Sequence, residues 1–281
     1  MKNYYVYANH IISIDLPETI PLLHLKQHLP GIEKSIIEKA DISITFKDSL
    51  DPQLRFDLQS LKIYDFYNSS WLLDLPHLIY SYLKYVFFHK NIYFVHSCMI
   101  QNTLLIGHSG SGKTSLCIQA LEQKLSINSC DRTCVTFEHK ADELNNELVT
   151  LHVISGTDVL SVRQEEKQPN LPMTNSSADR NIYGITMSDS HTIEKIKLFH
   201  ISPNKKEKSI EGLSKVHQLY SFFIDNIKSD CFVQNGKFIF SPVYSEKHKK
   251  ILFENLKNIR IPVSFVSGTI ENILQNTETK L

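Results

Sequence analysis

The residues best suited to chemistry form a glycine-rich motif near the middle of the chain. It comprises eight consecutive residues: Gly107, His108, Ser109, Gly110, Ser111, Gly112, Lys113 and Thr114. Glycines at these positions allow a tight turn whose backbone N–H groups point toward phosphate oxygens, and a helix that begins at Lys113 adds its positive dipole end. The pattern is typical of a phosphate-binding loop, or P-loop, in which Lys113 contacts the β- and γ-phosphates and Thr114 binds Mg²⁺.

The segments on either side of this motif suit a strand and a helix. Residues 104–106 are apolar, which favours a buried strand, and Leu116, Ala120 and Leu121 recur at helical spacing after the motif. A strand, a glycine-rich turn and a helix in this order are what phosphate binding requires. The alternative interpretation is a glycine-rich turn that binds no ligand.

The turn that follows the predicted helix carries a second chemical group. Asp131 precedes a predicted strand, at a sheet edge where open α/β folds place ligands. Transfer of a phosphoryl group to an alcohol requires a carboxylate within hydrogen-bond reach of the attacking hydroxyl. Asp131 is the best candidate for this general base, and a metal ligand or an ordinary turn residue are the alternatives.

Composition and charge limit the classes of partner. The 281 residues are 42% hydrophobic, and 30 basic residues balance 30 acidic ones. The chain is long enough for one large domain or for a small and a medium one, and it has no overall field that favours nucleic acid or an anionic membrane. It has no apolar run of about 18 residues and no signal-peptide pattern. We expect a soluble cytoplasmic protein that binds neither nucleic acid nor membrane.

The cysteines are scattered, at Cys98, Cys117, Cys130, Cys134 and Cys231. An odd number in a chain without an export signal predicts reduced thiols. Cys130, Cys134 and His139 are of types that bind zinc, but their neighbourhood supplies no fourth ligand.

Residues 1–74 are expected to form a small β-rich N-terminal part. Strand-forming residues gather in four runs, at residues 4–6, 11–14, 42–46 and 61–67. Polar residues and proline separate these runs, as at residues 15–17. Tyr64, Tyr67 and Trp71 suit a binding face or, more commonly, a core.

Residues 75–281 are expected to form an α/β domain around the glycine-rich motif. A helix with one apolar stripe is predicted to open at residues 75–76 and to end near residues 89–91. A strand at residues 92–100 and a tight turn at residues 101–102 then form a hairpin that leads into the motif.

Strands and helices are predicted to continue to the C-terminus. Further strands are expected at residues 133–137, 148–154, 159–162, 193–201 and 263–266, helices from Ser209, near Glu246 and from Thr269, and a hairpin at residues 232–240 around Asn235 and Gly236. Residues 164–180, rich in polar residues and proline, are expected to form a mobile loop.

The arrangement of these motifs resembles that of HPr kinase/phosphorylase and its shorter relatives, which include peptide-tailoring kinases. The matching features are a strand with His at residues 95–97, a hairpin, the P-loop motif, one helix and an Asp-Arg turn. Asp131 stands 18 positions after Lys113, which is the spacing of the second aspartate of the family's Asp-Asp pair. Cys130 stands in place of the first aspartate, and we match no residue to the family's downstream magnesium-binding glutamate.

The resemblance is centred on residues 75–137 and implies an HPr kinase-like P-loop domain that uses ATP and Mg²⁺ and assembles into oligomers. It also implies that His96 lies near the triphosphate, where it stabilises charge or a coupled proton. A hydrogen-bonded histidine within a buried strand is the alternative for His96. Arg132 is placed to contact phosphate or to pair with an acidic neighbour.

Two functions from different classes follow. The first is an ATP-dependent kinase that transfers the γ-phosphate to a serine-type hydroxyl of a peptide, a small protein or a small metabolite, with Asp131, His96 and Lys113 as catalytic residues. The second is a switch-like module in which nucleotide binding orders residues 164–180 for a protein partner. Acceptor-dependent release of ADP distinguishes the two. The sequence has no adenine-reading motif, so the choice between ATP and another nucleoside triphosphate stays open.

Overall fold

Apolar and polar residues alternate near the N-terminus, and these runs form strands in the computed structural model. In β4 (Ile42–Asp48), Ile42, Ile44 and Phe46 are buried while the residues between them are partly exposed. Alternation with a period of two places one face of a strand against a core.

The structure describes residues 2–16, 22–29, 31–37, 39–66, 71–141, 147–176, 179–187, 192–228, 232–234, 238–240, 242–275 and 277.

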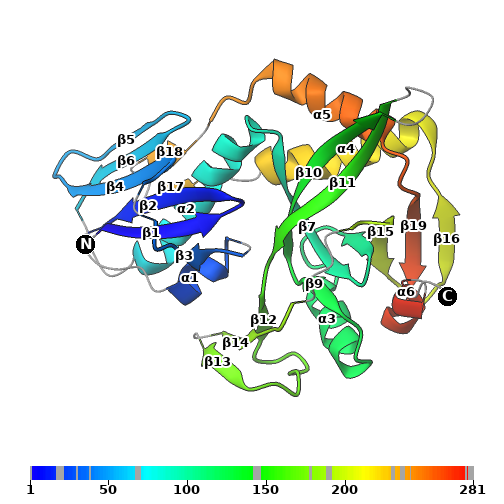
Figure 1. Ribbon diagram of the computed structural model, residues 1–281. Coiled ribbons are helices and arrows are strands. Elements are labelled where there is room, and N and C mark those ends of the chain that lie inside the picture. The colour runs from blue at the N-terminus through cyan, green and yellow to red at the C-terminus, as the bar shows by residue number, and fades with distance from the viewer. Residues whose placement is uncertain are drawn as a thin grey trace.

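The N-terminal strands build one mixed sheet, drawn in blue in Figure 1. They are β1 (Lys2–Tyr7), β2 (His10–Asp15), β3 (Glu33–Lys34), β4, β5 (Gln53–Phe56) and β6 (Ser60–Asp65). Their order across the sheet is β3-β1-β2-β4-β6-β5, and β4 is parallel to both β2 and β6. A short helix, α1 (Leu22–Lys26), buries Leu25 in the core of this sheet.

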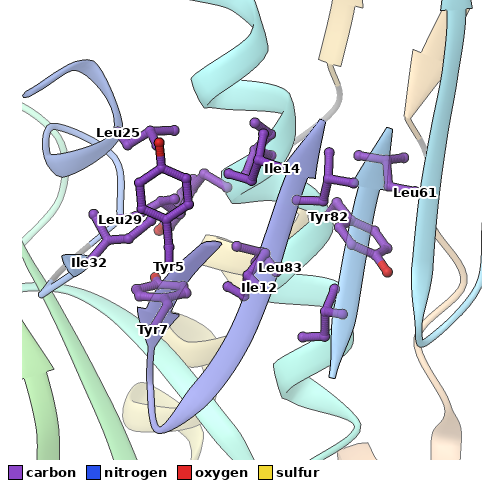
Figure 2. Close-up of a cluster of buried hydrophobic side chains, with 14 of the residues drawn as sticks. Tyr5, Tyr7, Ile12, Ile14, Leu25, Leu29, Ile32, Leu61, Tyr82 and Leu83 are labelled. Atoms are coloured by element: carbon purple, nitrogen blue, oxygen red, sulfur yellow. The ribbon is translucent and has the colours of Figure 1, made fainter. Parts of the chain in front are cut away.

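The long helix α2 (Trp71–Phe88) supplies the other half of the N-terminal core. Its buried side chains and those of the sheet form one cluster, in which Ile12 and Leu61 of the strands lie with Tyr82 and Leu83 of the helix (Figure 2). The predicted division between residues 74 and 75 stays a prediction. The helix crosses that division, and its buried residues from Leu75 onward pack against the N-terminal sheet.

The predicted start of α2 was wrong. The helix begins at Trp71 and contains Pro76, rather than opening at residues 75–76. Proline lacks the N–H that would bond to the carbonyl four residues earlier, and near the N-terminus of a helix this loss affects few hydrogen bonds. The apolar stripe and the predicted end agree with the structure, because turns at residues 89–91 follow Phe88.

A second, larger mixed sheet carries the glycine-rich motif. Over the described ranges its strands follow the order β11-β10-β7-β8-β15-β19-β16, and β9 also pairs with β7. They are β7 (Ile92–Ile100), β8 (Thr103–Ile106), β9 (Ile127–Ser129), β10 (Arg132–Ala141), β11 (Glu147–Gly156), β15 (Lys195–Ile201), β16 (Lys206–Ser209) and β19 (Val263–Gly268). The hairpin of β7 and β8 confirms the prediction, and β8 runs parallel to β15.

Helices cover both faces of this larger sheet. They are α3 (Lys113–Glu122), α4 (Gly212–Lys228), α5 (Glu246–Asn258) and α6 (Ile270–Gln275). Leu104 and Ile106 of β8 join a core with α4 and α5, whereas Leu105 points to the opposite core with α3 and α6. Figure 1 shows α4 and α5 above the sheet and α3 and α6 below it. Across the described residues the protein is therefore mixed α/β, with several mixed sheets and six helices.

Two smaller sheets complete the described structure. One consists of β12 (Val159–Arg163), β13 (Met173–Ser176) and β14 (Arg180–Gly184), and the other of β17 (Phe232–Gln234) and β18 (Phe238–Phe240). The first corrects the prediction of a loop at residues 164–180, because β13 lies within this segment and pairs with residues 181–183 of β14. Asn235 and Gly236, predicted as a hairpin turn, lie outside the described residues.

Ser209 does not cap α4, in contrast to the prediction. It is the last residue of the edge strand β16, where it lies opposite Ser264 of β19, and α4 begins later, at Gly212. The exposed residues of β16 have no apolar pattern, so the pairing depends on the backbone hydrogen bonds that β19 offers at the sheet edge.

Candidate functional site

The glycine-rich loop, residues 107–112, connects the buried central strand β8 to α3. Gly112 caps α3 with a φ of 93°, and Gly110 has a φ of 75°. Both values lie in the left-handed region that favours glycine. A Cβ on Gly112 would also collide with Cδ1 of Ile201 on the neighbouring strand β15. No side chain caps the first amides of α3, so these donors face the loop, as an anion site requires.

Lys113, the first residue of α3, folds back over the loop. Its Nζ donates hydrogen bonds to the carbonyl oxygens of Gly107 and His108, each at 3.0 Å. The side chain is only 5% exposed, and burial lowers the pKa of its ammonium group. The charge is therefore held at the centre of the loop by two neutral acceptors, which an anionic ligand can replace.

Asp131 and His96 form a hydrogen-bonded pair that lines the same cavity as Lys113 and the loop. Asp131 lies in the turn between β9 and β10, and His96 lies on β7, which pairs with β10. Their Oδ1 and Nε2 atoms are 2.9 Å apart. Sheet register produces this contact, because His96 lies directly opposite Arg132, the neighbour of Asp131.

The charges around Asp131 keep it ionised. Burial by itself raises the pKa of Asp131, but the hydrogen bond from His96 and the positive charges of Arg132 and Lys113 act more strongly and hold this pKa well below its usual range. The side chain is still 42% exposed, so a molecule in the adjacent cavity can reach it. A carboxylate in this state accepts a hydrogen bond readily and is a weak base.

Arg132 ties the Asp131 turn to the N-terminal part. One Nη atom donates to the carbonyl of Gln27 at 2.8 Å, and the guanidinium carbon lies 4.4 Å from the centroid of the Tyr80 ring. Its Nε is 3.9 Å from Oδ2 of Asp131. Arg132 therefore lies beside its acidic neighbour, between α2 and the residue that follows α1, and it also lines the polar cavity described next.

A polar cavity of about 600 Å³ joins these groups. The predicted site residues on its wall are Ser109, Gly110, Gly112, Lys113, Thr114, His96 and Asp131. Sequence reasoning missed other residues of this wall, five of which are charged or come from the N-terminal part. Gln27 and His28 follow α1, and Arg163, Glu166 and Arg180 come from the segment around the small sheet of β12 to β14. Because the chain brings them in from distant segments, the motif spacing held no signal for them.

A second cavity, of about 950 Å³, lies on the other side of the loop. Loop residues His108 and Ser111 contribute to it, together with Phe199 of β15 and Phe222 of α4. The rings of His108 and Phe222 are 4.8 Å apart between centroids. Its lining is mainly apolar and aromatic, in contrast to the charged cavity beside Asp131. Gly107 is the one predicted loop residue that lines neither of these two described cavities.

Oxygen donors suited to Mg²⁺ are present near Lys113. The hydroxyl-bearing Thr114 and the carboxylate Asp131 line the same cavity, and Mg²⁺ commonly takes one or two protein oxygens and completes its shell with water and phosphate. The donor set therefore fits Mg²⁺. Cys130 also lines the cavity, whereas Cys134 is buried in the N-terminal core. Among the described residues, no group of three or more His, Cys, Asp or Glu side chains is arranged to bind a metal by itself.

Comparison with known proteins leaves the family open. The sequence matches no protein-family model, and no curated protein is significantly similar to it. None of the helices in the described part of the chain combines the length and the apolar character that a membrane crossing needs.

Proposed function

We propose that this protein is an ATP-dependent kinase of the HPr kinase-like type, which transfers the γ-phosphate to a serine-type hydroxyl of a peptide, a small protein or a small metabolite. The observation that carries the proposal is the convergence of Lys113, Thr114 and the Asp131–His96 pair on one polar cavity. A loop that only capped a helix would not need an ionised carboxylate on the facing turn. The sequence resemblance supports the same conclusion.

The two cavities support one orientation of the nucleotide. The γ-phosphate must face Asp131, so the triphosphate crosses the loop with its other end toward the apolar cavity on the far side. An aromatic base suits the rings of Phe199 and Phe222 there, because flat π-systems bury well against aromatic side chains. In this orientation the base lies near β15 and α4, and the acceptor enters beside Asp131.

Lys113 and the first amides of α3 bind the phosphates in this mechanism. Lys113 exchanges the carbonyls of Gly107 and His108 for the β- and γ-phosphate oxygens, which are stronger acceptors because they are charged. Thr114 would hold Mg²⁺, with water and phosphate oxygens completing the metal's shell. When bound, the metal offsets the negative charge of the β- and γ-phosphate oxygens.

Asp131 orients the acceptor and receives its proton. The acceptor hydroxyl donates a hydrogen bond to Asp131, and its oxygen forms a bond to the γ-phosphorus while the bond from that phosphorus to the bridging oxygen breaks. The proton then passes to Asp131, and the products are ADP and a phosphate ester. Because the pKa of Asp131 is low, the proton transfer is late, and the main contribution of the carboxylate is orientation. His96 fixes the carboxylate through its hydrogen bond at 2.9 Å.

The test is incubation of the full chain with γ-labelled ATP, Mg²⁺ and pools of peptides or cell metabolites, followed by mass detection of a labelled phosphate ester. The variant Lys113→Ala provides the negative control, and Lys208→Ala, at an exposed position of β16, provides the matched lysine control. We expect a labelled product from the wild type and from Lys208→Ala, and none from Lys113→Ala. Nucleotide binding without any labelled ester would favour the switch-like module instead.

A further inference from the structure

Three cysteine side chains meet in the core between α3 and the larger sheet. Cys98 lies on β7, Cys117 on α3 and Cys130 in the turn that follows β9. The thiol of Cys117 is in hydrogen-bond contact with the thiols of both Cys98 and Cys130, and its Sγ also donates to the carbonyl oxygen of Cys130 at 3.6 Å. All three are free thiols in the structure. Cys117 therefore lies at the centre of a chain of three sulfur atoms.

Cys130 is the member of this cluster that a small solute meets first. Of the four cysteines that the structure describes, it is the one that lines the polar cavity beside Lys113 and Asp131. Its exposure is only 2%, so a reagent must be small and must enter through that cavity. Cys98 and Cys117 are fully buried.

The two buried thiols are unreactive by themselves. The hydrogen bond with Cys117, followed by burial, raises the pKa of Cys98, and the hydrogen bond with Cys130 raises the pKa of Cys117. Thiols that are buried and hard to deprotonate are not attacked first by an oxidant. Oxidation of the cluster must therefore begin at Cys130.

We propose that Cys130 and Cys117 form a redox-sensitive pair, which a hydroperoxide such as H₂O₂ converts into a disulfide. In the first step the O–O bond of the peroxide breaks and one oxygen bonds to the sulfur of Cys130, which yields a sulfenic acid and water. The sulfur of Cys117 then bonds to that of Cys130, the S–O bond breaks, and the hydroxyl leaves as a second water with the proton of the Cys117 thiol. The two thiols lose two electrons, which the peroxide accepts.

The order of the three thiols selects this pair. The sulfenic acid forms on Cys130, whose contacting thiol is that of Cys117, whereas Cys98 lies on the other side of Cys117. The turn is held in place, because the N–H of Cys130 donates to the carbonyl of Thr157 at 3.2 Å. The two sulfur atoms therefore stay neighbours after the first oxidation, although 13 positions separate the residues in the chain.

The disulfide joins the two halves of the proposed site. Cys117 lies about one helical turn after Lys113, and Cys130 directly precedes Asp131. The bond thus ties the helix that carries the phosphate-binding lysine to the turn that carries the carboxylate. A nucleotide at the loop covers the wall through which the oxidant enters, so it should slow the oxidation. The pair goes beyond the proposed function, and only this protection rests on it.

The experiment treats the full chain with H₂O₂, blocks the remaining thiols by alkylation and identifies linked peptides by mass spectrometry without reduction. We expect a disulfide between Cys117 and Cys130 in the wild type and in the control Cys134→Ser, whose thiol lies in the N-terminal core. Cys117→Ser should stop at a sulfenic acid on Cys130, trapped as its dimedone adduct. Cys130→Ser should form no disulfide within the cluster.

A second measurement follows the rate of disulfide formation with AMP-PNP and Mg²⁺ present. At ten times its dissociation constant the nucleotide leaves about one tenth of the protein unoccupied, so it should slow the reaction by about tenfold. Calorimetry on the untreated protein establishes that dissociation constant. Failure to bind AMP-PNP would count against the proposed function and would leave the mapping of the disulfide unaffected.

Four results would overturn the inference. They are the absence of a disulfide in the wild type, a disulfide that links other cysteines, a disulfide between Cys98 and Cys117 in Cys130→Ser at the wild-type rate, and an oxidation rate that bound AMP-PNP leaves unchanged. The same treatment in denaturant shows the pairing that an unfolded chain produces. An identical pattern in the folded protein would also contradict a role for the cluster.

Discussion

Replacement of Asp131 by asparagine removes one negative charge from the cavity and little else. Asparagine has nearly the same size, and its side-chain oxygen can still accept the hydrogen bond from Nε2 of His96, which is 2.9 Å long in the structure. The turn should therefore keep its shape. The variant loses the acceptor for the substrate proton. Because a positioned acid or base contributes about 10²–10⁴-fold in rate, or roughly 3–5 kcal/mol, we expect the turnover rate to fall by about that factor.

Nucleotide affinity should respond much less to this change. Lys113 and the amides of α3 remain in place, so we expect the dissociation constant of ATP to change by less than about threefold, or roughly 0.6 kcal/mol. The assay compares the turnover rate of saturated enzyme with nucleotide affinity from calorimetry, and Asp51→Asn, an exposed aspartate between β4 and β5, is the matched control. Parallel loss of affinity and turnover would make Asp131 a metal ligand. Unchanged turnover would refute its role altogether.

Further predictions concern the loop and its surroundings. Lys113→Ala should abolish turnover and strongly weaken nucleotide binding in calorimetry, because it removes the point charge of the loop. Thr114→Ala should raise the Mg²⁺ concentration for half-maximal activity, and superimposable titrations would exclude this ligand. Gly112→Ala should lower the unfolding midpoint more than Gly110→Ala. Both changes put a Cβ on a residue with positive φ, but only the Cβ at position 112 would collide with Ile201. Equal losses of unfolding midpoint would contradict this collision.

The stability of the protein should also depend on pH through His28. Burial, followed by the positive charge of Arg132, lowers the pKa of His28 from 6.5 to about 3. Below about pH 6.5 the unfolded chain therefore binds a proton that the folded chain does not, and stability falls by up to about 1.4 kcal/mol per pH unit from this group. Denaturant unfolding of His28→Gln between pH 7 and pH 4 should show a flatter decline than wild type. An equal decline would contradict the assignment.

Local patterns predicted the elements that bear the loop. The hairpin of β7 and β8 and the helix α3 follow from apolar runs, from a two-residue turn and from helical spacing, all of which are properties of a short segment. Gln101, in the predicted turn, indeed has a positive φ of 53°. The sequence predicted that Asp131 and His96 both lie near the bound triphosphate, but not that they contact each other. The register of β10 on β7 brings the two side chains into direct contact.

Tertiary context decided the features that the sequence did not reveal. α2 starts at Trp71 although Pro76 suits a first turn, and its buried residues from Leu75 onward pack against the N-terminal sheet. Arg163 and Arg180 are 17 positions apart in the chain, and the register of β12 on β14 places them opposite each other. Gln27 reaches the cavity through its carbonyl bond to Arg132, a contact between residues 105 positions apart. No pattern within a short segment can encode such contacts.

The most direct test of the central claim is the yield of phosphorylated acceptor per ADP released, measured by mass spectrometry on one reaction with γ-labelled ATP and Mg²⁺. The kinase mechanism predicts equal amounts of the two products, with the label in the ester, and loss of both products in Asp131→Asn. ADP accompanied only by free labelled phosphate, or an ester yield that survives Asp131→Asn unchanged, would contradict it.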